Sequence, residues 1–447
     1  MSRNRVSRRS FLRGSGKMFA LATAVGALPL LDSCGGSSAS MIINPPPDPG
    51  YTGADSQLMD EIERAAFQFF WDQANPLTGL IKDRANATGT DSYTVSSIAS
   101  VGFGLTALCI ADSRGYMASA TIRDRVQLTL NTLFNSAEGN NGFFYHFLDM
   151  ATAKRAFTSE LSSIDSAILL CGVLTARQFY KNDAQIPGLA TQIYERVNWQ
   201  WMLDNTTNTL WMGWTPESGF INARWDHYSE LMMMYLLGIG SPTYPLPSAS
   251  WSAWSRPTFT YNGVTYISSG DPLFTHQFSH AWFDFRNKHD AFGDYFQNSV
   301  KATQAHKSFC LSLANQYPNY ADDLWGITAS DSIHGYVAWG GPPATGPIDG
   351  TVVPCAAGGS LPFLYSDCMK VLRNIRSKFA ARAWGKYGYI DALNPGSGWT
   401  NPDVIGLDVG ITMLMVENYR TQFVWNTFMA NSEMQSAMQL AGFQPNP

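Results

Sequence analysis

Apolar residues recur with helical spacing through most of this chain. In the first half, the spacing predicts helices over 58–73, 96–111, 120–135, 162–179, 189–203 and 230–237. In the second half, it predicts helices over 277–287, 294–316, 361–381, 410–429 and 432–441, with loops rich in proline and glycine between them. Strand-like alternation is confined to short segments such as 258–268, where Asn262 and Gly263 indicate a surface hairpin.

The arrangement of these helices follows from how their apolar residues are distributed. A helix that is apolar nearly all round, such as 230–237, must be buried, whereas an amphipathic helix covers a core with one face. Many helices separated by loops of uneven length therefore favour an all-α closed double ring, with buried inner helices and amphipathic outer ones. An open α-solenoid is the alternative, but it would show a fixed repeat, and the sequence shows none.

Composition narrows the class of protein. The chain has 447 residues, of which 45% are hydrophobic, enough for a large core in one domain or several. Charged residues make up only 15%, and the net charge is -5 with no long basic run beyond the N-terminus, so nucleic acid is not an expected partner. Fourteen Trp and nineteen Tyr are either core residues or, for some of them, the lining of a carbohydrate groove.

The first residues have the pattern of a targeting segment. Arg8 and Arg9 precede an apolar run over 18–31, which is typical of a twin-arginine export signal and shorter than the roughly 20 residues of a membrane span. Residues 31–34 resemble a lipoprotein cleavage box, so either Cys34 is lipidated or cleavage occurs nearby without lipid. We expect residues 1–34 to direct export to the periplasm or outer membrane, with attachment only through Cys34. A tether over 35–53 then leads to one domain over 54–447.

The other cysteines do not suggest disulfides or metal binding. They are odd in number and mostly lie within apolar helical patterns, so we expect buried thiols in a protein that folds before export. The sequence contains no CxxC pair and no HExxH motif, and it predicts no metal site and no cofactor. These cysteines are Cys109, Cys171, Cys310, Cys355 and Cys368.

Polar residues gather at the starts of the predicted helices. A ring would bring the starts of its inner helices to one end, so we expect a single polar cleft there. The clusters cover 79–84, 160–165, 224–230, 276–280, 325–331 and 406–408.

Three carboxylates within these clusters are candidates for acid or base catalysis. Glu230 precedes an apolar helix, where burial would favour the protonated form that a general acid needs, although an acidic residue there can also simply stabilise the helix N-terminus. Asp408 lies between Gly406 and Gly410, with room for a water that a base would activate, but aspartate is also an ordinary N-cap. Asp165 can likewise be either a base or an N-cap, and it is the reserve candidate.

For other polar residues, a structural role is the favoured interpretation. His276 and His280 are spaced to share a helical face, yet no acidic residue completes a metal site, so we favour hydrogen-bonded neighbours or sugar contacts. Asp284 and Arg286 suit a salt bridge. The polar run over 417–420 predicts a buried network near the ring centre.

Taken together, the segments over 55–443 resemble the bacterial glycoamylase-like family, which includes endo-β-1,2-glucanases and sophorose-releasing enzymes. The resemblance implies an (α/α)6 barrel and inverting hydrolysis of β-1,2-linked glucose without metal. We expect a monomer whose partner is a glucan or gluco-oligosaccharide substrate. It rests on 79–84, 225–230 with 240–242, 273–286, 325–331 with 335–336, 349–351, 406–408 and 417–420.

The resemblance also implies roles for individual residues. Glu230 corresponds to the acid and Asp408 to the base, with the proton passing directly or through a substrate hydroxyl. A non-catalytic glucan-binding lipoprotein, and a hydrolase or phosphorylase of another linkage, remain the alternatives. The expected substrate contacts are Arg84, Trp225, Tyr228, His276, His280, Trp282, Arg286, Asp331, Tyr336 and Trp399.

Overall fold

The computed structural model describes residues 54–447, except 271 and 343–345. The expected export signal, Cys34 and the whole tether lie outside the described residues. Among the residues that are described, no helix is long and apolar enough to cross a membrane. The five cysteines from Cys109 onward are buried free thiols, as the sequence predicts.

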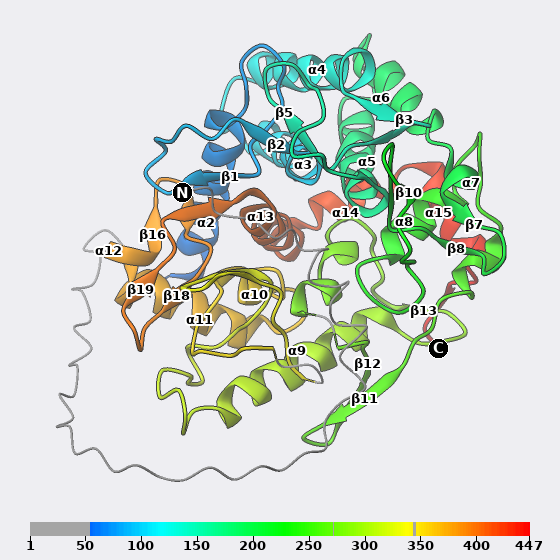
Figure 1. Ribbon diagram of the computed structural model, residues 1–447. Coiled ribbons are helices and arrows are strands. Elements are labelled where there is room, and N and C mark those ends of the chain that lie inside the picture. Colours follow the sequence, from blue (N-terminus) through cyan, green and yellow to red (C-terminus); the bar gives the residue numbers. More distant parts are fainter. Residues whose placement is uncertain (1–53, 271, 343–345) are drawn as a thin grey trace.

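The helices form two concentric rings, which confirms the predicted all-α (α/α)6 barrel (Figure 1). The inner ring consists of α3 (Ile98–Ser113), α5 (Ser163–Phe179), α8 (Met232–Ile239), the short turns η2 (Leu273–His276) and η3 (Phe278–Ala281), α10 (Pro354–Gly358) and α13 (Gly406–Thr421). The outer ring consists of α2 (Asp55–Asp72), α4 (Ser119–Asn135), α6 (Ile186–Glu195), α9 (Tyr295–Ser312), α11 (Tyr365–Lys378) and α15 (Ser432–Leu440).

Burial separates the two rings as the apolar patterns predict. Every residue of α8 is buried, and so is α3 from its start to Ala111, whereas α2 and α11 bury one face each. The inner helices α3 and α5 approach so closely that glycines meet at their crossing. A Cβ atom added to Gly172 would lie 2.1 Å from the carbonyl oxygen of Gly102.

We therefore expect Gly172→Ala to destabilise the protein by about 1–3 kcal/mol, because the added methyl group forces the two backbones apart. Gly188→Ala in α6 is the matched control, since its added Cβ would meet nothing within 4 Å. That change should be neutral or stabilising by up to about 1 kcal/mol, through helix propensity alone. Urea unfolding measures both, and equal midpoints for the two variants would contradict the close crossing.

The inner helices run parallel, so their starts lie at one end of the ring. Gly406 at the start of α13 packs against Ser100 near the start of α3, while Arg114 after α3 bonds Glu417 near the end of α13. Short strands join the helix starts, and the sequence does not predict them because two or three residues are too few to show alternation. They pair β1 (Arg84–Asn86) with β20 (Asp403–Ile405), β2 (Val95–Ser97) with β5 (Phe147–Asp149), and β6 (Leu161–Ser162) with β9 (Gly213–Thr215).

Two further differences concern the predicted elements. The helix predicted over 277–287 is wrong, because this segment forms the short 3-10 turn η3, whose buried Ser279 bonds across to the backbone around Glu230. The helix predicted over 410–429 is interrupted at Gln422, which adopts φ 62° between α13 and α14 (Phe423–Phe428). The hairpin prediction is confirmed by β11 (Thr258–Tyr261) and β12 (Val264–Ile267).

Candidate active site

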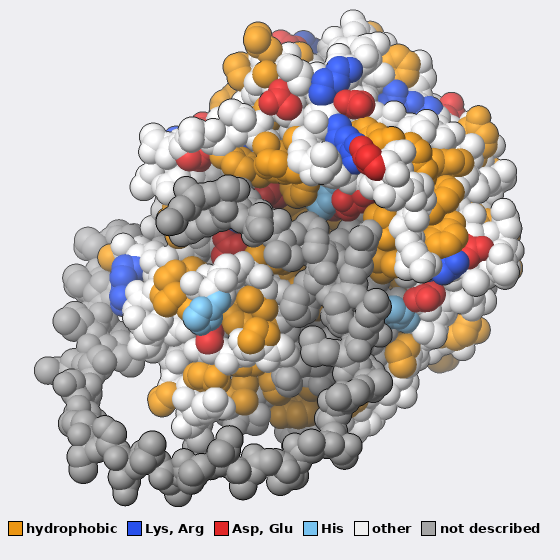
Figure 2. Space-filling model, viewed as in Figure 1, with side chains coloured by type: hydrophobic (Ala, Val, Ile, Leu, Met, Phe, Trp, Pro, Cys, Tyr) orange, Lys and Arg blue, Asp and Glu red, His pale blue; other side chains and the backbone are white. Residues whose placement is uncertain are grey.

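The three candidate carboxylates lie at the end of the ring where the inner helices begin. Asp165 is in the first turn of α5 and Asp408 in the first turn of α13, while Glu230 lies two residues before α8. All three are buried, with 5–6% of each residue exposed. On the face seen in Figure 2, acidic side chains and a histidine lie near the middle, among hydrophobic ones.

Asp408 is paired with a second carboxyl group that sequence reasoning missed. The carboxyl groups of Asp408 and Asp391 are close enough to interact, and burial together with the neighbouring Asp408 raises the pKa of Asp391 well above its ordinary value. Oδ2 of Asp391 accepts hydrogen bonds from the backbone N–H of Asp331 and from Nδ2 of Asn401, both at 2.8 Å. A cavity of about 20 Å³ touches both carboxyl-bearing residues, enough for one water.

Arg84 supplies positive charge beside this pair. Its guanidinium donates to Asp331 at 2.7 Å and lies 3.3 Å from Asp83, and Asn401 also donates to Asp331 at 3.1 Å. The pairing of β1 with β20 places Arg84 opposite Ile405, directly before α13. The cluster thus joins residues from five separate parts of the chain around Asp408.

Asp165 is held by a different set of partners. The hydroxyl group of Ser162, the N-cap of α5, donates to its carboxylate, and Nε2 of His146 lies 3.7 Å away. The other ring nitrogen of His146 lies 3.3 Å from Glu160, and Phe147 stacks on the imidazole. His146 is the second residue that sequence reasoning missed, although an imidazole within the aromatic run over 143–147 was a visible signal.

The turn that carries Glu230 is fixed from two sides. Its carbonyl oxygen accepts a hydrogen bond from Ser279 at 2.8 Å, and Ser279 in turn accepts one from the backbone of Met233. At the start of the same segment, the indole of Trp225 donates to Ser163 of α5 at 2.9 Å. These bonds set the position of the Glu230 backbone relative to α5 and η3.

The predicted substrate contacts divide by position. Arg84 and Asp331 lie beside Asp408, and Tyr336 pairs opposite Asp331 in the hairpin of β14 (Ser330–Ser332) and β15 (Gly335–Val337). Tyr336 and Trp399 are half-buried, so each ring retains some exposed surface. These four residues remain predicted contacts.

The structure corrects two of the predicted substrate contacts, one aromatic and one charged. Trp282 is completely buried, packs on Phe103 and donates to Thr106 at 3.0 Å, so it has no ring face for a sugar. Arg286 lies beside Gln422 after the end of α13, at the opposite end of the ring, where it pairs with Asp284 as the alternative reading proposed. Local composition did not reveal at which end of the ring these side chains lie.

The remaining predicted contacts are buried supporting residues. His276 bonds the hydroxyl group of Tyr228 at 3.0 Å, and His280 bonds Ser299 at 3.0 Å. Burial lowers the pKa of each histidine to about 3, so both are neutral near pH 7. Together with the buried Trp225, they hold the segments behind Glu230 in place.

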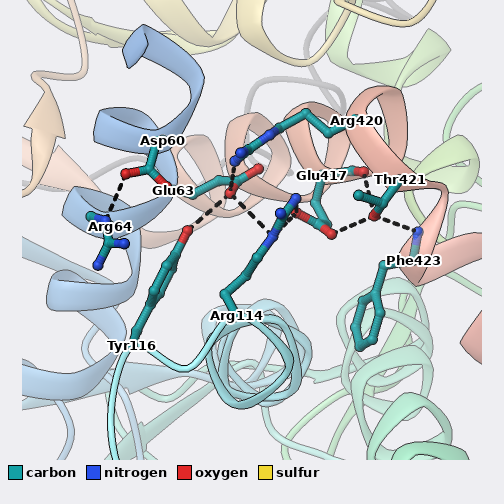
Figure 3. A network of polar contacts seen from close by, with 9 residues as sticks. All are labelled: Asp60, Glu63, Arg64, Arg114, Tyr116, Glu417, Arg420, Thr421 and Phe423. Carbon is teal, nitrogen blue, oxygen red and sulfur yellow. Dashed lines mark hydrogen bonds and ion pairs between the residues drawn. The ribbon is translucent and has the colours of Figure 1, made fainter. Parts of the chain in front are cut away.

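The polar run over 417–420 belongs to a network at the far end of the ring (Figure 3). Glu417 accepts from Arg114 at 2.5 Å, and Arg420 bonds the completely buried Glu63 of α2, which also accepts from Tyr116 at 3.0 Å. The predicted network therefore exists, but it lies where α3 and α13 end rather than at the ring centre. Asn418 stands apart from it and donates to the backbone of Ala281.

This network should make stability depend on pH. Burial and the nearby Glu417 raise the pKa of Glu63 from 4.5 to about 8, so the folded protein retains a proton that the unfolded chain has released. The free energy of unfolding should then fall as pH rises from about 4.5 to about 8. Thermal unfolding across this range should show a smaller fall for Glu63→Gln than for Asp124→Asn, an exposed control; equal slopes would contradict the assignment.

Comparison with known proteins agrees with the fold. The family described as "Glycoamylase: Putative glucoamylase" matches residues 222–432, which include Glu230 and Asp408. A curated relative, the exo β-1,2-glucooligosaccharide sophorohydrolase (non-reducing end) of Parabacteroides distasonis, is 29% identical over 428 residues. That match covers 87% of this chain and 58% of the relative, so the chain spans little more than half of the relative's length.

Solved structures show the same relationship over almost the whole ring. The endo-β-1,2-glucanase of Chitinophaga pinensis, in complex with sophorotriose and glucose, has a TM-score of 0.82 and 26% identity, covering 88% of this chain and 99% of that one. The β-1,2-glucanase of Parabacteroides distasonis has a TM-score of 0.81 and 26% identity, covering 87% of this chain and 60% of that one. This chain thus has the (α/α)6-barrel fold of these structures and is similar to the bacterial glycoamylase-like proteins over most of its length.

Proposed function

We propose that the protein is an inverting glycoside hydrolase that cleaves β-1,2-linked gluco-oligosaccharides, with Glu230 as general acid and Asp408 as general base. The observation that carries the proposal is the placement of two buried carboxylates at the same end of the ring, on the starts of different inner segments. The named activities of the sophorohydrolase and glucanase relatives supply the linkage.

The two carboxylates differ in surroundings in the way that the two roles require. Glu230 is buried ahead of the wholly apolar α8, and such surroundings favour a protonated carboxyl group that can donate to the leaving glycosidic oxygen. Asp408 lies in the first turn of α13, beside the cavity that has room for one water. The base would remove a proton from water as that water attacks the anomeric carbon from the opposite side.

A specific contact keeps Asp165 as a second candidate for the base. His146 lies 3.7 Å from its carboxylate, so a proton taken from water could be shared with the imidazole. In this second scheme, Asp408 would instead position the substrate. Variants of the two aspartates distinguish the schemes.

The activity is tested by incubating the purified protein with linear β-1,2-glucan, sophoro-oligosaccharides and starch, and resolving the products. We expect cleavage of the β-1,2-linked substrates only, with the α-anomer formed first, as proton NMR would record. Activity on starch alone would overturn the linkage. A rate that depends on phosphate would indicate phosphorolysis, and calorimetric binding without products would indicate a glucan-binding protein.

An exposed aromatic residue near Asp165 offers a further sugar contact. Phe157 is 60% exposed, packs on Phe147 next to His146, and adopts φ 55°, which is strained for a residue with a side chain. Arg155 holds the loop in this conformation, donating to the carbonyl groups of Thr158 and Ser159 while pairing with Glu217. A strained, anchored loop that displays an aromatic ring suits stacking on a glucose unit.

Phe157→Ala should therefore raise KM for sophoro-oligosaccharides roughly tenfold, as expected for loss of about 1.4 kcal/mol of stacking, with kcat little changed. Leu440→Ala in α15 is a control of similar exposure, at 58%, and should leave both constants unchanged. Steady-state kinetics on one oligosaccharide decides the matter: an unaltered KM for Phe157→Ala removes this residue from the site.

A further inference from the structure

We propose that Asp391 is a positioning residue that retains a proton and donates it in a hydrogen bond to Asp408, which keeps Asp408 ionised and aimed at water. The proposal rests on the proposed role of Asp408 as the base. Asp391 itself does not contact substrate in this scheme. It acts through Asp408 alone.

The hydrogen bonds around Asp391 assign the proton to one atom. Two carboxyl groups can hydrogen-bond to each other only when one of them is protonated. Oδ2 of Asp391 already accepts two N–H groups, from Asp331 and Asn401, so a proton on this residue must be on Oδ1. Oδ1 is buried and is left for the bond to Asp408.

The surroundings decide which partner holds the proton. Asp391 is only 2% exposed, and two adjacent carboxylates in such a place cannot both be ionised at modest cost. Asp408 lies in the first turn of a 16-residue helix, whose dipole stabilises a negative charge there. Asp391 lies between strands, away from any helix start. The two N–H groups on its Oδ2 favour the ionised form, but burial and the neighbouring Asp408 outweigh them, and the raised pKa of Asp391 agrees with the neutral form.

The other titratable groups around the pair do not change which of the two aspartates carries the proton. The cluster adds Asp331, Asp83 and Asp403 as negative charges and Arg84 as the positive charge that bonds Asp331. The cavity beside the pair is also lined by two tyrosines and a cysteine, which are neutral near pH 7, while α2 contributes only apolar residues to it. The three residues are Tyr387, Tyr389 and Cys355.

Two substitutions of Asp391 distinguish a protonated carboxyl group that donates a hydrogen bond from an ionised one. Asp391→Asn keeps a donor for Asp408 and an acceptor for Asn401, so kcat should fall by less than about tenfold and the pH profile should keep its acidic limb. Asp391→Leu removes the donor, so kcat should fall by more than about 100-fold and the acidic limb should move to higher pH, because ionised Asp408 loses its hydrogen bond. An Asn variant as inactive as Asp408→Asn would overturn the proposal.

Infrared spectroscopy tests whether Asp391 carries the proton, without relying on activity. The difference spectrum of wild type minus Asp391→Asn at pH 7 should contain the carbonyl band of a protonated carboxyl group. A carboxylate band in its place would overturn the proposal even if Asp408 is the base. If instead the protonated band is present and Asp408→Asn remains active, the base assignment fails while the proton on Asp391 stands.

Discussion

Glu230→Gln is expected to lower kcat on sophoro-oligosaccharides by roughly 100- to 10,000-fold, the usual contribution of a general acid. Glutamine fills the same buried space but has no proton to give to the leaving oxygen. Substrate binding should persist, so KM should change little. An aryl β-glucoside or β-sophoroside with an acidic phenol as leaving group should lose much less activity, because that leaving group departs without protonation.

The control for this change is Glu195→Gln on the outer helix α6, which should behave as wild type. Circular dichroism of both variants establishes that the ring is intact. Near-normal turnover of Glu230→Gln on the natural oligosaccharide would exclude Glu230 as the acid. An equal loss on the natural and the aryl substrates would indicate a role in positioning rather than proton donation.

Asp408→Asn is expected to cause a loss of the same order, because the attacking water then has no base. Asp165→Asn should have a smaller effect if Asp408 is the base, since Asp165 would then act only on substrate position or local structure. Added azide, an anion that attacks without losing a proton, should restore part of the turnover of Asp408→Asn. Inversion would yield an α-configured glycosyl azide from the β-linked substrate.

The two aspartates can also give the reverse result. If Asp165→Asn abolishes turnover and responds to azide while Asp408→Asn does neither, the base is Asp165 with His146 beside it. The pH profile then supplies an independent check, because the wild-type acidic limb should change on His146→Gln. No such change is expected when Asp408 is the base.

Much of the fold could be predicted from the chain alone. The helices 96–111 and 162–179 correspond to α3 and α5 within two residues at either end, because a segment buried on all sides is apolar throughout its length. The sequence also placed three carboxylates at helix starts. It misassigned 277–287, where hydrogen bonds to other inner segments outweigh local helical preference.

The apolar pattern and the motifs were enough to predict the class of fold, the resemblance to the glycoamylase-like family and the carboxylates at the starts of inner helices. The side chains that surround these carboxylates became known from the three-dimensional arrangement. Asp391 meets Asp408 because its backbone N–H donates to Asp403, shortly before α13, and His146 reaches Asp165 from a separate hairpin. Helical periodicity specifies which face of a helix is buried, but burial alone does not specify a neighbour. Which residues distant in the chain become neighbours depends on how the ring closes. The same closure placed Trp282 in the core and Arg286 at the opposite end of the ring.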